Sequence, residues 1–212
     1  MLKINIFGNK LYLYLLVFSN FLAISTAHSQ NYVWPTSASK LLTSSFCEFR
    51  PRHYHAAIDI KTWNRTGYRI FAIDDGYVMR VRVSAFGYGK ALYVKLKDGN
   101  IVVYAHLQKF WPELEEYVNS VRLKNQKYRL DLHLTPDKFP LSQGQLIAYS
   151  GKTGIGYPHL HFEIRNPKNQ PMNPMQFYRA EVQDSYAPQL YKVALFPMNH
   201  TSLINQRSDT LF

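Results

Sequence analysis

The sequence predicts a mainly β protein that carries one helical insertion, and three observations lead to this prediction. From residue 69 onward, apolar and polar residues alternate in short stretches, which is the period of a half-buried strand. Turn-forming pairs such as Asp75-Gly76 and Asp98-Gly99 separate these stretches. One stretch, at about residues 111–126, shows the spacing of a helix instead.

The predicted strands follow one another at short intervals. They comprise residues 69–73, 77–83, 91–96, 101–106, 145–150, 159–165 and 190–196. Residues 107–140 are expected to interrupt the sheet. His106 then falls at the end of a strand, where functional side chains of a β scaffold often lie.

The predicted helix begins at a proline. Pro112 suits the first turn of a helix, and Glu113 and Glu115 favour the positive end of its dipole. Its apolar residues recur at helical spacing, namely Leu114, Tyr117, Val118 and Val121. We expect a helix of about 12 to 15 residues within this insertion.

The first 29 residues have the features of a secretory signal peptide. Lys3 and Lys10 give a positive start, residues 11–24 are mostly apolar, and Ala27-His28-Ser29 places small residues before a cleavage point. We expect cleavage after Ser29, or else after Ala27, and a protein exported to the periplasm, cell envelope or extracellular space. Contact with the membrane would be transient, through this leader. A membrane anchor is the alternative, but the apolar run is short for a spanning helix.

The chain is strongly basic, with a formal net charge of +11. Loss of the leader removes Lys3 and Lys10, two of these charges, and leaves +9. A basic exported protein is attracted to anionic polymers such as cell-wall polymers or nucleic acid. No stacking motif or basic-aromatic repeat supports nucleic acid, so we expect no such partner. Basicity that serves only solubility is the alternative.

Cys47 is the one cysteine of the chain, so no disulfide can form within it. Its neighbours Phe46 and Phe49 do not suggest the low-pKa surroundings of a catalytic thiol. We expect Cys47 to be buried as a small apolar side chain.

Two histidines on one predicted strand form half of a candidate metal site. His159 and His161 are two residues apart, so their side chains leave the same face of the strand. Leu160 and Phe162 would turn toward a core. Neutral imidazole nitrogen is a good ligand for zinc. Two histidines on a solvated strand face are the alternative.

His55 and Asp59 offer the other half of such a site. Four residues apart, they share a face on a helix or on a strand. Pro51 and the β-branched Ile58 and Ile60 favour a turn followed by a strand. A hydrogen-bonded pair on the surface is the alternative.

Together with His106, these four residues offer the parts of a zinc hydrolase. Such an enzyme needs three protein ligands and an open position for water. It also needs a base for the proton of the water and a donor that stabilises the oxyanion. The residues alone leave open which side chain takes which role.

Three segments resemble the three signatures of the lysostaphin/LytM-like zinc metallopeptidases, which are bacterial endopeptidases that cut the peptide cross-links of peptidoglycan. The segments are His55-Ala56-Ala57-Ile58-Asp59, Tyr104-Ala105-His106-Leu107 and Pro158-His159-Leu160-His161-Phe162-Glu163. The turns at 75–78, 86–89 and 151–154 also resemble the family, and the similarity runs from about residue 45 to 177.

The resemblance implies a role for each of the five residues. His55, Asp59 and His161 would bind one Zn²⁺, while His106 and His159 would activate water and polarise the scissile carbonyl. The implied fold is a compact antiparallel β-sheet of the duplicated-hybrid-motif type, with a groove for an extended peptide.

This chain departs from the family pattern at two places. The family usually has glycine at the position of Ala57. The loop before Pro158 is shorter here and lacks the customary serine. Both departures leave the five polar residues intact, but both bear on how a substrate fits.

These interpretations divide the chain into four parts. They are a signal peptide at 1–29, an approach segment at 30–44, a LytM-like domain at 45–181, and a linker with the start of a further β module at 182–212. The predicted function is that of an exported zinc endopeptidase whose substrate is peptidoglycan peptide.

Two other functions fit parts of the same sequence. One is a catalytically weak LytM-like domain that binds the cell wall or activates another wall hydrolase. The other is a carbohydrate- or wall-binding module whose histidines are incidental. The sequence leaves open which cross-link is cut and what the oligomeric state is.

Overall fold

The computed structural model of the chain describes residues 31–51, 53–182 and 203. The predicted signal peptide and the predicted strand at 190–196 lie outside these residues. Within the described ranges, no helix has both the length and the apolar character needed to cross a membrane.

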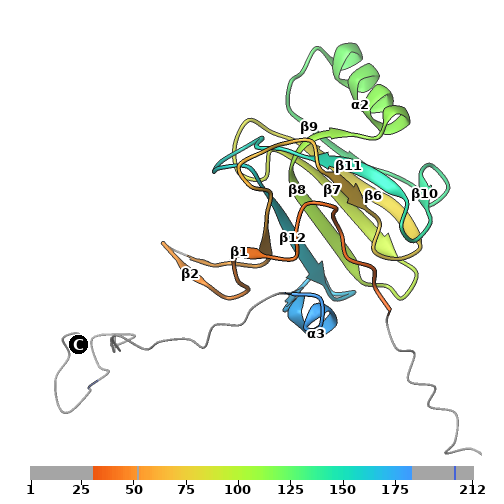
Figure 1. Cartoon of the computed structure of the whole chain (residues 1–212). Coiled ribbons are helices and arrows are strands. Elements are labelled where there is room, and N and C mark those ends of the chain that lie inside the picture. The colour runs from red at the N-terminus through yellow and green to blue at the C-terminus, as the bar shows by residue number, and fades with distance from the viewer. Residues whose placement is uncertain (1–30, 52, 183–202, 204–212) are drawn as a thin grey trace, which may run out of the picture.

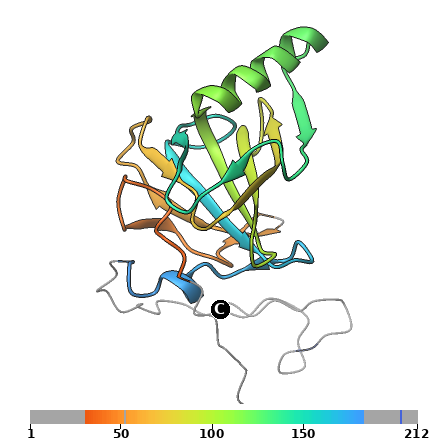
Figure 2. The same cartoon turned by 90° about the vertical axis from the view of Figure 1, so that its right-hand side faces the viewer.

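Most of the described strands join one antiparallel sheet (Figures 1 and 2). The strands are β1 (Leu42–Ser44), β4 (Ile58–Lys61), β5 (Arg69–Phe71), β6 (Gly76–Val83), β7 (Lys90–Leu96), β8 (Ile101–Phe110), β9 (Leu130–His133), β10 (Pro140–Leu141), β11 (Leu146–Ser150), β12 (His159–Arg165) and β13 (Pro171–Met172). Their main order is β1-β4-β12-β8-β7-β6-β10, and β5, β9, β11 and β13 pair beside this path. A separate hairpin joins β2 (Phe49–Arg50) to β3 (His53–Tyr54).

The predicted mainly β fold with a helical insertion is confirmed, and two details differ. Strand β8 continues past His106 to Phe110, so His106 lies inside a strand and not at its end. Leu107 and Phe110 are buried while the two residues between them are exposed, which breaks the alternation that marks a strand. Strand β9 lies within residues 107–140, where an interruption was expected, and it is a short, partly exposed partner of β6.

The two faces of the sheet carry apolar clusters of different size. Leu160 and Phe162 are fully buried in the larger cluster, as predicted, together with Tyr104. Ala105 belongs to a smaller cluster on the other face and pairs directly with His161. Directly paired residues of antiparallel strands share a face, so the functional side chains lie on the face opposite the larger core.

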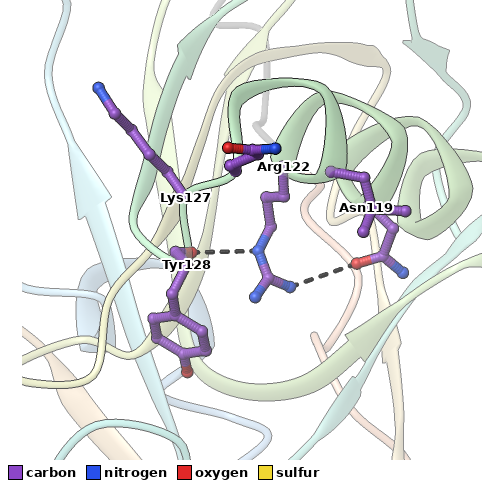
Figure 3. Close-up of a pocket in the computed structure, with 6 residues that line it drawn as sticks. Asn119, Arg122, Lys127 and Tyr128 are labelled. Carbon is purple, nitrogen blue, oxygen red and sulfur yellow. Dashed lines mark hydrogen bonds between the residues drawn. The ribbon is translucent and has the colours of Figure 1, made fainter.

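Helix α2 (Pro112–Asn125) follows β8 and projects beyond the sheet in Figures 1 and 2. Leu114 and Val118 are buried and hold its first half to the core. At its other end a cavity of about 690 Å³ opens, where Arg122 donates hydrogen bonds to the carbonyl of Tyr128 and to Asn119 (Figure 3). None of the five predicted site residues lines this cavity.

The residues predicted as an approach segment pack against the sheet. Tyr32 and Thr36 are buried, and the N–H of Val33 donates to the carbonyl of Ile73 at 3.0 Å. The hydroxyl of Tyr178, in helix α3 (Met175–Tyr178), donates to the carbonyl of Val33 at 2.9 Å. The segment that carries Val33 therefore contacts helix α3, although the two are far apart in the sequence.

Cys47 is exposed, so the prediction of a buried side chain is wrong. It lies in the turn between β1 and β2, with a positive φ of 61°. Its N–H donates to the carbonyl of His55 at 2.8 Å. Main-chain hydrogen bonding, and not burial of the thiol, holds this turn.

Candidate metal centre

Strand register brings two of the predicted metal ligands together. Asp59 on β4 and His161 on β12 are directly paired residues of neighbouring antiparallel strands. Such a pair shares one face of the sheet, with Cβ atoms about 4.5 to 5.5 Å apart. Nδ1 of His161 accordingly lies 3.0 Å from Oδ1 of Asp59.

His55 reaches the same point from the connection between β3 and β4, not from a strand. Its N–H donates to the carbonyl of Glu48 at 2.9 Å, which ties this connection to the preceding turn. Its ring Nδ1 lies 2.9 Å from the carbonyl oxygen of Ser45. A carbonyl can only accept, so Nδ1 carries the proton and Nε2 keeps its lone pair for a metal.

The three predicted ligand atoms form a nearly equilateral triangle. Nε2 of His55 lies 3.2 Å from Oδ1 of Asp59 and 3.3 Å from Nδ1 of His161, and the third side is 3.0 Å. Two ligands on a tetrahedral zinc ion, with bonds of about 2.0 to 2.1 Å, lie about 3.3 to 3.4 Å apart. All three side chains are buried. The donor set, its spacing and its burial therefore fit a zinc ion.

Charge interactions among these ligands shift their pKa values. Burial raises the pKa of Asp59, but hydrogen bonds from His161 and His55 outweigh it and hold that pKa well below its usual range. Burial lowers the pKa of His161, yet hydrogen bonds to Asp59 and Glu163 raise it above its usual value overall. Both ring nitrogens of His161 face carboxylate oxygens, so the raised pKa favours the doubly protonated ring in the metal-free protein, and a metal at Nδ1 would replace the proton there.

Glu163 orients His161, a role that the sequence analysis did not assign. Its carboxylate accepts a hydrogen bond of 2.8 Å from Nε2 of His161, which leaves Nδ1 as the ligand atom. Glu163 is fully buried and also accepts hydrogen bonds from Tyr88 and, at 2.6 Å, from Arg165. The spacing of His159, His161 and Glu163 at every second residue was the available signal, because it places all three on one strand face.

Arg50 orients Asp59 in a similar way. Its Nη2 donates to Oδ2 of Asp59 at 2.9 Å and to Oγ of Ser44 at 2.7 Å. The other oxygen, Oδ1, is thereby left to face His55 and His161. Nothing in the sequence marked Arg50, because a tertiary contact through the β2–β3 hairpin brings it to Asp59.

His106 has a left-handed backbone, with φ of 59°, which is rare for a residue other than glycine. Strand β8 pairs with β12 up to Ala105 and with β11 from Leu107, so His106 lies where the strand changes partner. The pairing with β7 also shifts register between Tyr104 and Leu107, which marks a β-bulge. This bulge turns the imidazole of His106 toward β12.

The ring of His106 is held as a neutral base. Its Nδ1 lies 2.9 Å from the carbonyl oxygen of Thr153, so Nδ1 donates and Nε2 keeps its lone pair. Burial lowers its pKa to about 4, and the nearby His159 and His161 rings act in the same direction. His106 is therefore unprotonated at neutral pH.

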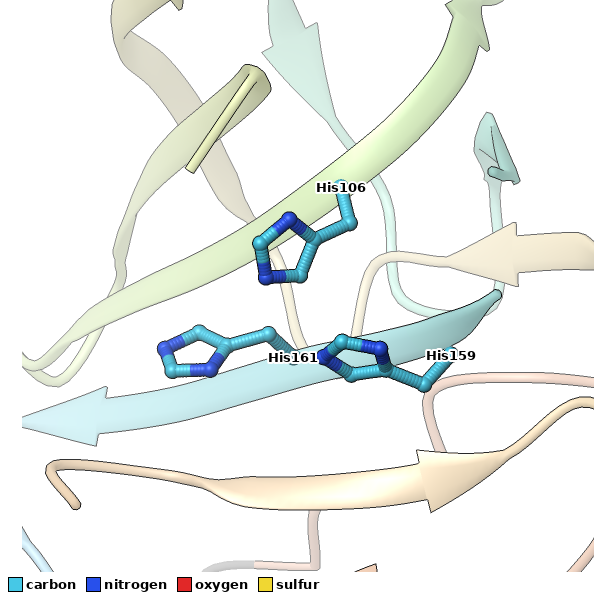
Figure 4. A group of neighbouring side chains, drawn as sticks. All are labelled: His106, His159 and His161. Atoms are coloured by element: carbon cyan, nitrogen blue, oxygen red, sulfur yellow. The ribbon is translucent and has the colours of Figure 1, made fainter. Parts of the chain in front are cut away.

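His159 lies beside His106, and Figure 4 shows both rings with that of His161. The rings of His106 and His159 have centroids 4.5 Å apart. Nδ1 of His159 donates to the carbonyl of Tyr157 at 2.7 Å, and its Nε2 lies 3.6 Å from Oδ1 of Asp59. His106, His159 and His161 form a second group able to hold a metal, which shares His161 with the first.

A glycine loop supports His106 from behind. Gly154 has φ of +86°, and a Cβ there would lie 2.1 Å from the carbonyl oxygen of Gly87. The two loops therefore touch through their backbones. This contact fixes Thr153, whose carbonyl holds His106.

The two departures from the family pattern leave this arrangement intact. Ala57 is fully buried, and β4 keeps its register with β12 just beyond it. Beside the centre lies an open cavity of about 390 Å³, whose lining includes Asp59, His159 and Tyr157 from the short loop before β12. The predicted groove therefore has a counterpart at this point.

No protein-family model matches the chain, and no curated protein matches it. Similar solved structures include a zinc-containing peptidase from Vibrio cholerae, with 25% identity over 69% of this chain and 38% of that one, and a TM-score of 0.47. The catalytic domain of lysostaphin from Staphylococcus simulans has 21% identity over 73% and 98% of the two chains, with a TM-score of 0.47. The catalytic domain of the prophage-encoded protein EnpA from Enterococcus faecalis, as a point mutant, has 22% identity over 68% and 92%, with a TM-score of 0.45. These similar structures are LytM-type peptidases, and the likeness is one of fold.

Proposed function

We propose that this chain is an exported zinc metalloendopeptidase that hydrolyses peptide cross-links of bacterial peptidoglycan. The observation that carries the proposal is the triangle of His55, Asp59 and His161 with two further imidazoles beside it. A metal-binding surface alone would need only the triangle. The second pair, His106 and His159, supplies the proton-transfer groups that hydrolysis requires.

His55, Asp59 and His161 would hold the zinc ion. When bound, the ion supplies Lewis-acid chemistry, because it lowers the pKa of water and polarises a carbonyl. The protein contributes ligands whose protonation and direction are already set. Ser45 and Glu163 fix the ring nitrogens of the two histidines, and Arg50 fixes the oxygen of Asp59.

His106 is the proposed general base. Its Nε2 is unprotonated and accepts a proton from the attacking water, whose oxygen forms a bond to the scissile carbonyl carbon. The peptide C–N bond then breaks, and the departing nitrogen takes the same proton back from the His106 imidazolium. His106 therefore ends the cycle neutral, as its lowered pKa favours.

His159 is the proposed stabiliser of the oxyanion. Its Nδ1 proton is engaged by Tyr157, so Nε2 donates only when the ring carries a second proton. Its Nε2 lies 3.6 Å from Oδ1 of Asp59, at the edge of the proposed metal site. A proton donated from Nε2 would stabilise the negative charge that develops on the carbonyl oxygen.

The proposed location rests on the leader. The proposed substrate rests on the charge of the molecule and on the cavity beside the centre. The signal-peptide features of residues 1–29 support export to the cell envelope. The formal charge of +9 that remains after loss of Lys3 and Lys10, two charges from +11, supports attraction to anionic wall polymer. An extended cross-link peptide suits an open cavity beside the centre.

The test is digestion of purified peptidoglycan by the full-length chain, with and without a zinc chelator. We expect chelator-sensitive release of fragments, whose masses identify the bond that is cut. A folded, zinc-loaded protein that binds peptidoglycan but releases nothing contradicts the proposal and supports the catalytically weak wall-binding domain. Wall binding that is unaffected by metal removal supports the module with incidental histidines.

A further inference from the structure

The cavity beside the metal centre has a lining that the catalytic roles do not explain. Its walls include Arg50, Glu48, Asn64 and Tyr157 as well as Asp59 and His159. Most of these groups are polar, and three of them, Arg50, Glu48 and Asp59, carry charge. A cavity of this kind next to a reactive centre selects a polar substrate group, because burying an unmatched apolar group there gains little.

The guanidinium of Arg50, which lines this cavity, has N–H donors that its contacts with Asp59 and Ser44 do not use. The two N–H groups of its Nη2 are engaged by Asp59 and Ser44. Within the described residues, its Nε and Nη1 make no hydrogen bond, and its side chain is 33% exposed. A guanidinium offers five N–H groups, so three remain for a ligand. An acceptor with negative charge matches them best.

The other charges of the cavity leave room for such a ligand. Glu48 contributes one negative charge, but it is exposed at the rim and is held by Ser44 and by the N–H of Ser45 at 3.3 Å. Asp59 contributes the second negative charge, and the positive charge of Arg50 offsets one of these two. A zinc ion among its ligands would make the net formal charge of the cavity positive.

We propose that this cavity is the subsite for a free carboxylate on the substrate residue next to the scissile bond, and that Arg50 is its anchor. The inference rests on the proposed function and names its substrate class. The enzyme then selects cross-links in which the residue beside the cleaved bond keeps its α-carboxylate. Cross-links whose neighbouring residue is glycine within a chain, or is amidated, are poor substrates.

A pair of ligands tests this inference by binding, without depending on turnover. Each ligand joins D-alanine to the side-chain nitrogen position of lysine, with a ketomethylene unit in place of the scissile amide. One ligand ends in an α-carboxylate and the other in an α-carboxamide. We expect the zinc-loaded full-length chain to bind the carboxylate about 10-fold or more tightly, the usual effect of a charge-assisted hydrogen bond.

Two variants assign this preference to the cavity. Arg50→Gln should abolish the preference, whereas Arg82→Gln on β6, a matched loss of one charge away from the cavity, should keep it. Glu48→Gln removes the negative charge at the exposed rim and should increase the preference, with the zinc content unchanged. Zinc content is measured for every variant. If Arg50→Gln does not hold zinc, the Glu48→Gln result decides.

Several outcomes overturn the inference. Equal affinity of the two ligands for the wild-type chain is one. A preference that survives in Arg50→Gln means that the carboxylate binds elsewhere, for example at the metal. Equal weakening of both ligands in Arg50→Gln means that Arg50 only positions Asp59. A clear carboxylate preference with no digestion of peptidoglycan refutes the proposed function and leaves the subsite standing.

Discussion

At the scale of single residues, each proposed ligand uses one of its polar atoms for a hydrogen bond within the protein. Nδ1 of His55 donates to the carbonyl of Ser45, Nε2 of His161 donates to Glu163, and Oδ2 of Asp59 accepts from Arg50. Each ligand is left with one atom facing the centre of the triangle. Partners of this kind set the orientation and the basicity of metal ligands.

Replacement of His161 by alanine should remove both zinc and hydrolysis while the fold is kept. The fold is kept because Glu163 retains its hydrogen bonds from Tyr88 and Arg165. Metal analysis, peptidoglycan digestion and circular dichroism measure the three properties. His133→Ala is the control, since His133 is exposed on β9 and should change none of them. Full activity of His161→Ala would show that the ligand assignment is wrong.

Replacement of His106 by alanine should slow hydrolysis by about 10²- to 10⁴-fold, the usual contribution of a general acid-base group. Zinc should stay bound, because the triangle of His55, Asp59 and His161 does not include His106. Steady-state kinetics and metal analysis on the same sample separate the two effects. If zinc is lost together with activity, His106 is a ligand of the second group with His159 and His161.

Acid should inactivate the enzyme through metal loss before it protonates the base. The pKa of His161 is raised above its usual value, so a proton competes with the metal and zinc affinity falls as pH drops through that raised pKa. The pKa of His106 is lowered to about 4, so this ring stays neutral until much lower pH. Zinc content and rate measured from pH 8 to pH 4 should fall together. Added zinc should restore activity at pH 5 to 6, and failure to do so would point to protonation of a catalytic group.

At the scale of elements, the site depends on where strands change partners. Strand β8 leaves β12 and joins β11 at His106, and the bulge there gives that residue its left-handed backbone. In a regular strand, successive side chains point to opposite faces, so without the bulge His106 would point away from the face that carries Ala105. The loop from Gly151 to Gly154 packs behind this point and carries the carbonyl of Thr153 to His106.

Gly154→Ala should therefore reduce both stability and catalysis. Its positive φ strains alanine, and the new Cβ would meet the carbonyl oxygen of Gly87 at 2.1 Å. Gly144→Ala is a matched control, because Gly144 has φ of +78° but nothing within 4 Å of the added Cβ. We expect Gly154→Ala to lower the free energy of unfolding by at least about 1 kcal/mol more than Gly144→Ala. Denaturant melts and hydrolysis rates measure this, and equal effects of the two variants would refute the contact.

At the scale of the whole molecule, a metal would cross-link parts of the chain that are far apart in sequence. His55 and Asp59 come from the region of β3 and β4, and His161 comes from β12. These parts are already held by the sheet and by the contact of Tyr178 with Val33. A bound metal would therefore add to a formed fold, unlike the metal of a zinc finger, which creates the fold.

Removal of zinc should lower the stability of the protein without unfolding it. A ligand at 100 to 1,000 times its dissociation constant stabilises the native state by about 2.7 to 4.1 kcal/mol. Thermal unfolding with zinc, and with a chelator in excess, measures the difference, and far-ultraviolet circular dichroism of the chelated protein should retain the β signal. His161→Ala should melt at the same temperature with and without zinc. An unfolded chelated protein would show that metal and fold are inseparable.

The sequence by itself determined the local features of this protein. Alternation of apolar and polar residues identified most strands, and proline and helical spacing identified α2. Three short segments that resemble the LytM-like signatures predicted the five polar residues of the candidate site. These features depend on neighbouring residues, so they can be read along the chain. The tertiary structure alone decided the bulge at His106, the contact of Arg50 with Asp59 and the burial of Glu163 behind His161. Each of these depends on the register of strands that are distant in sequence, which local patterns do not specify.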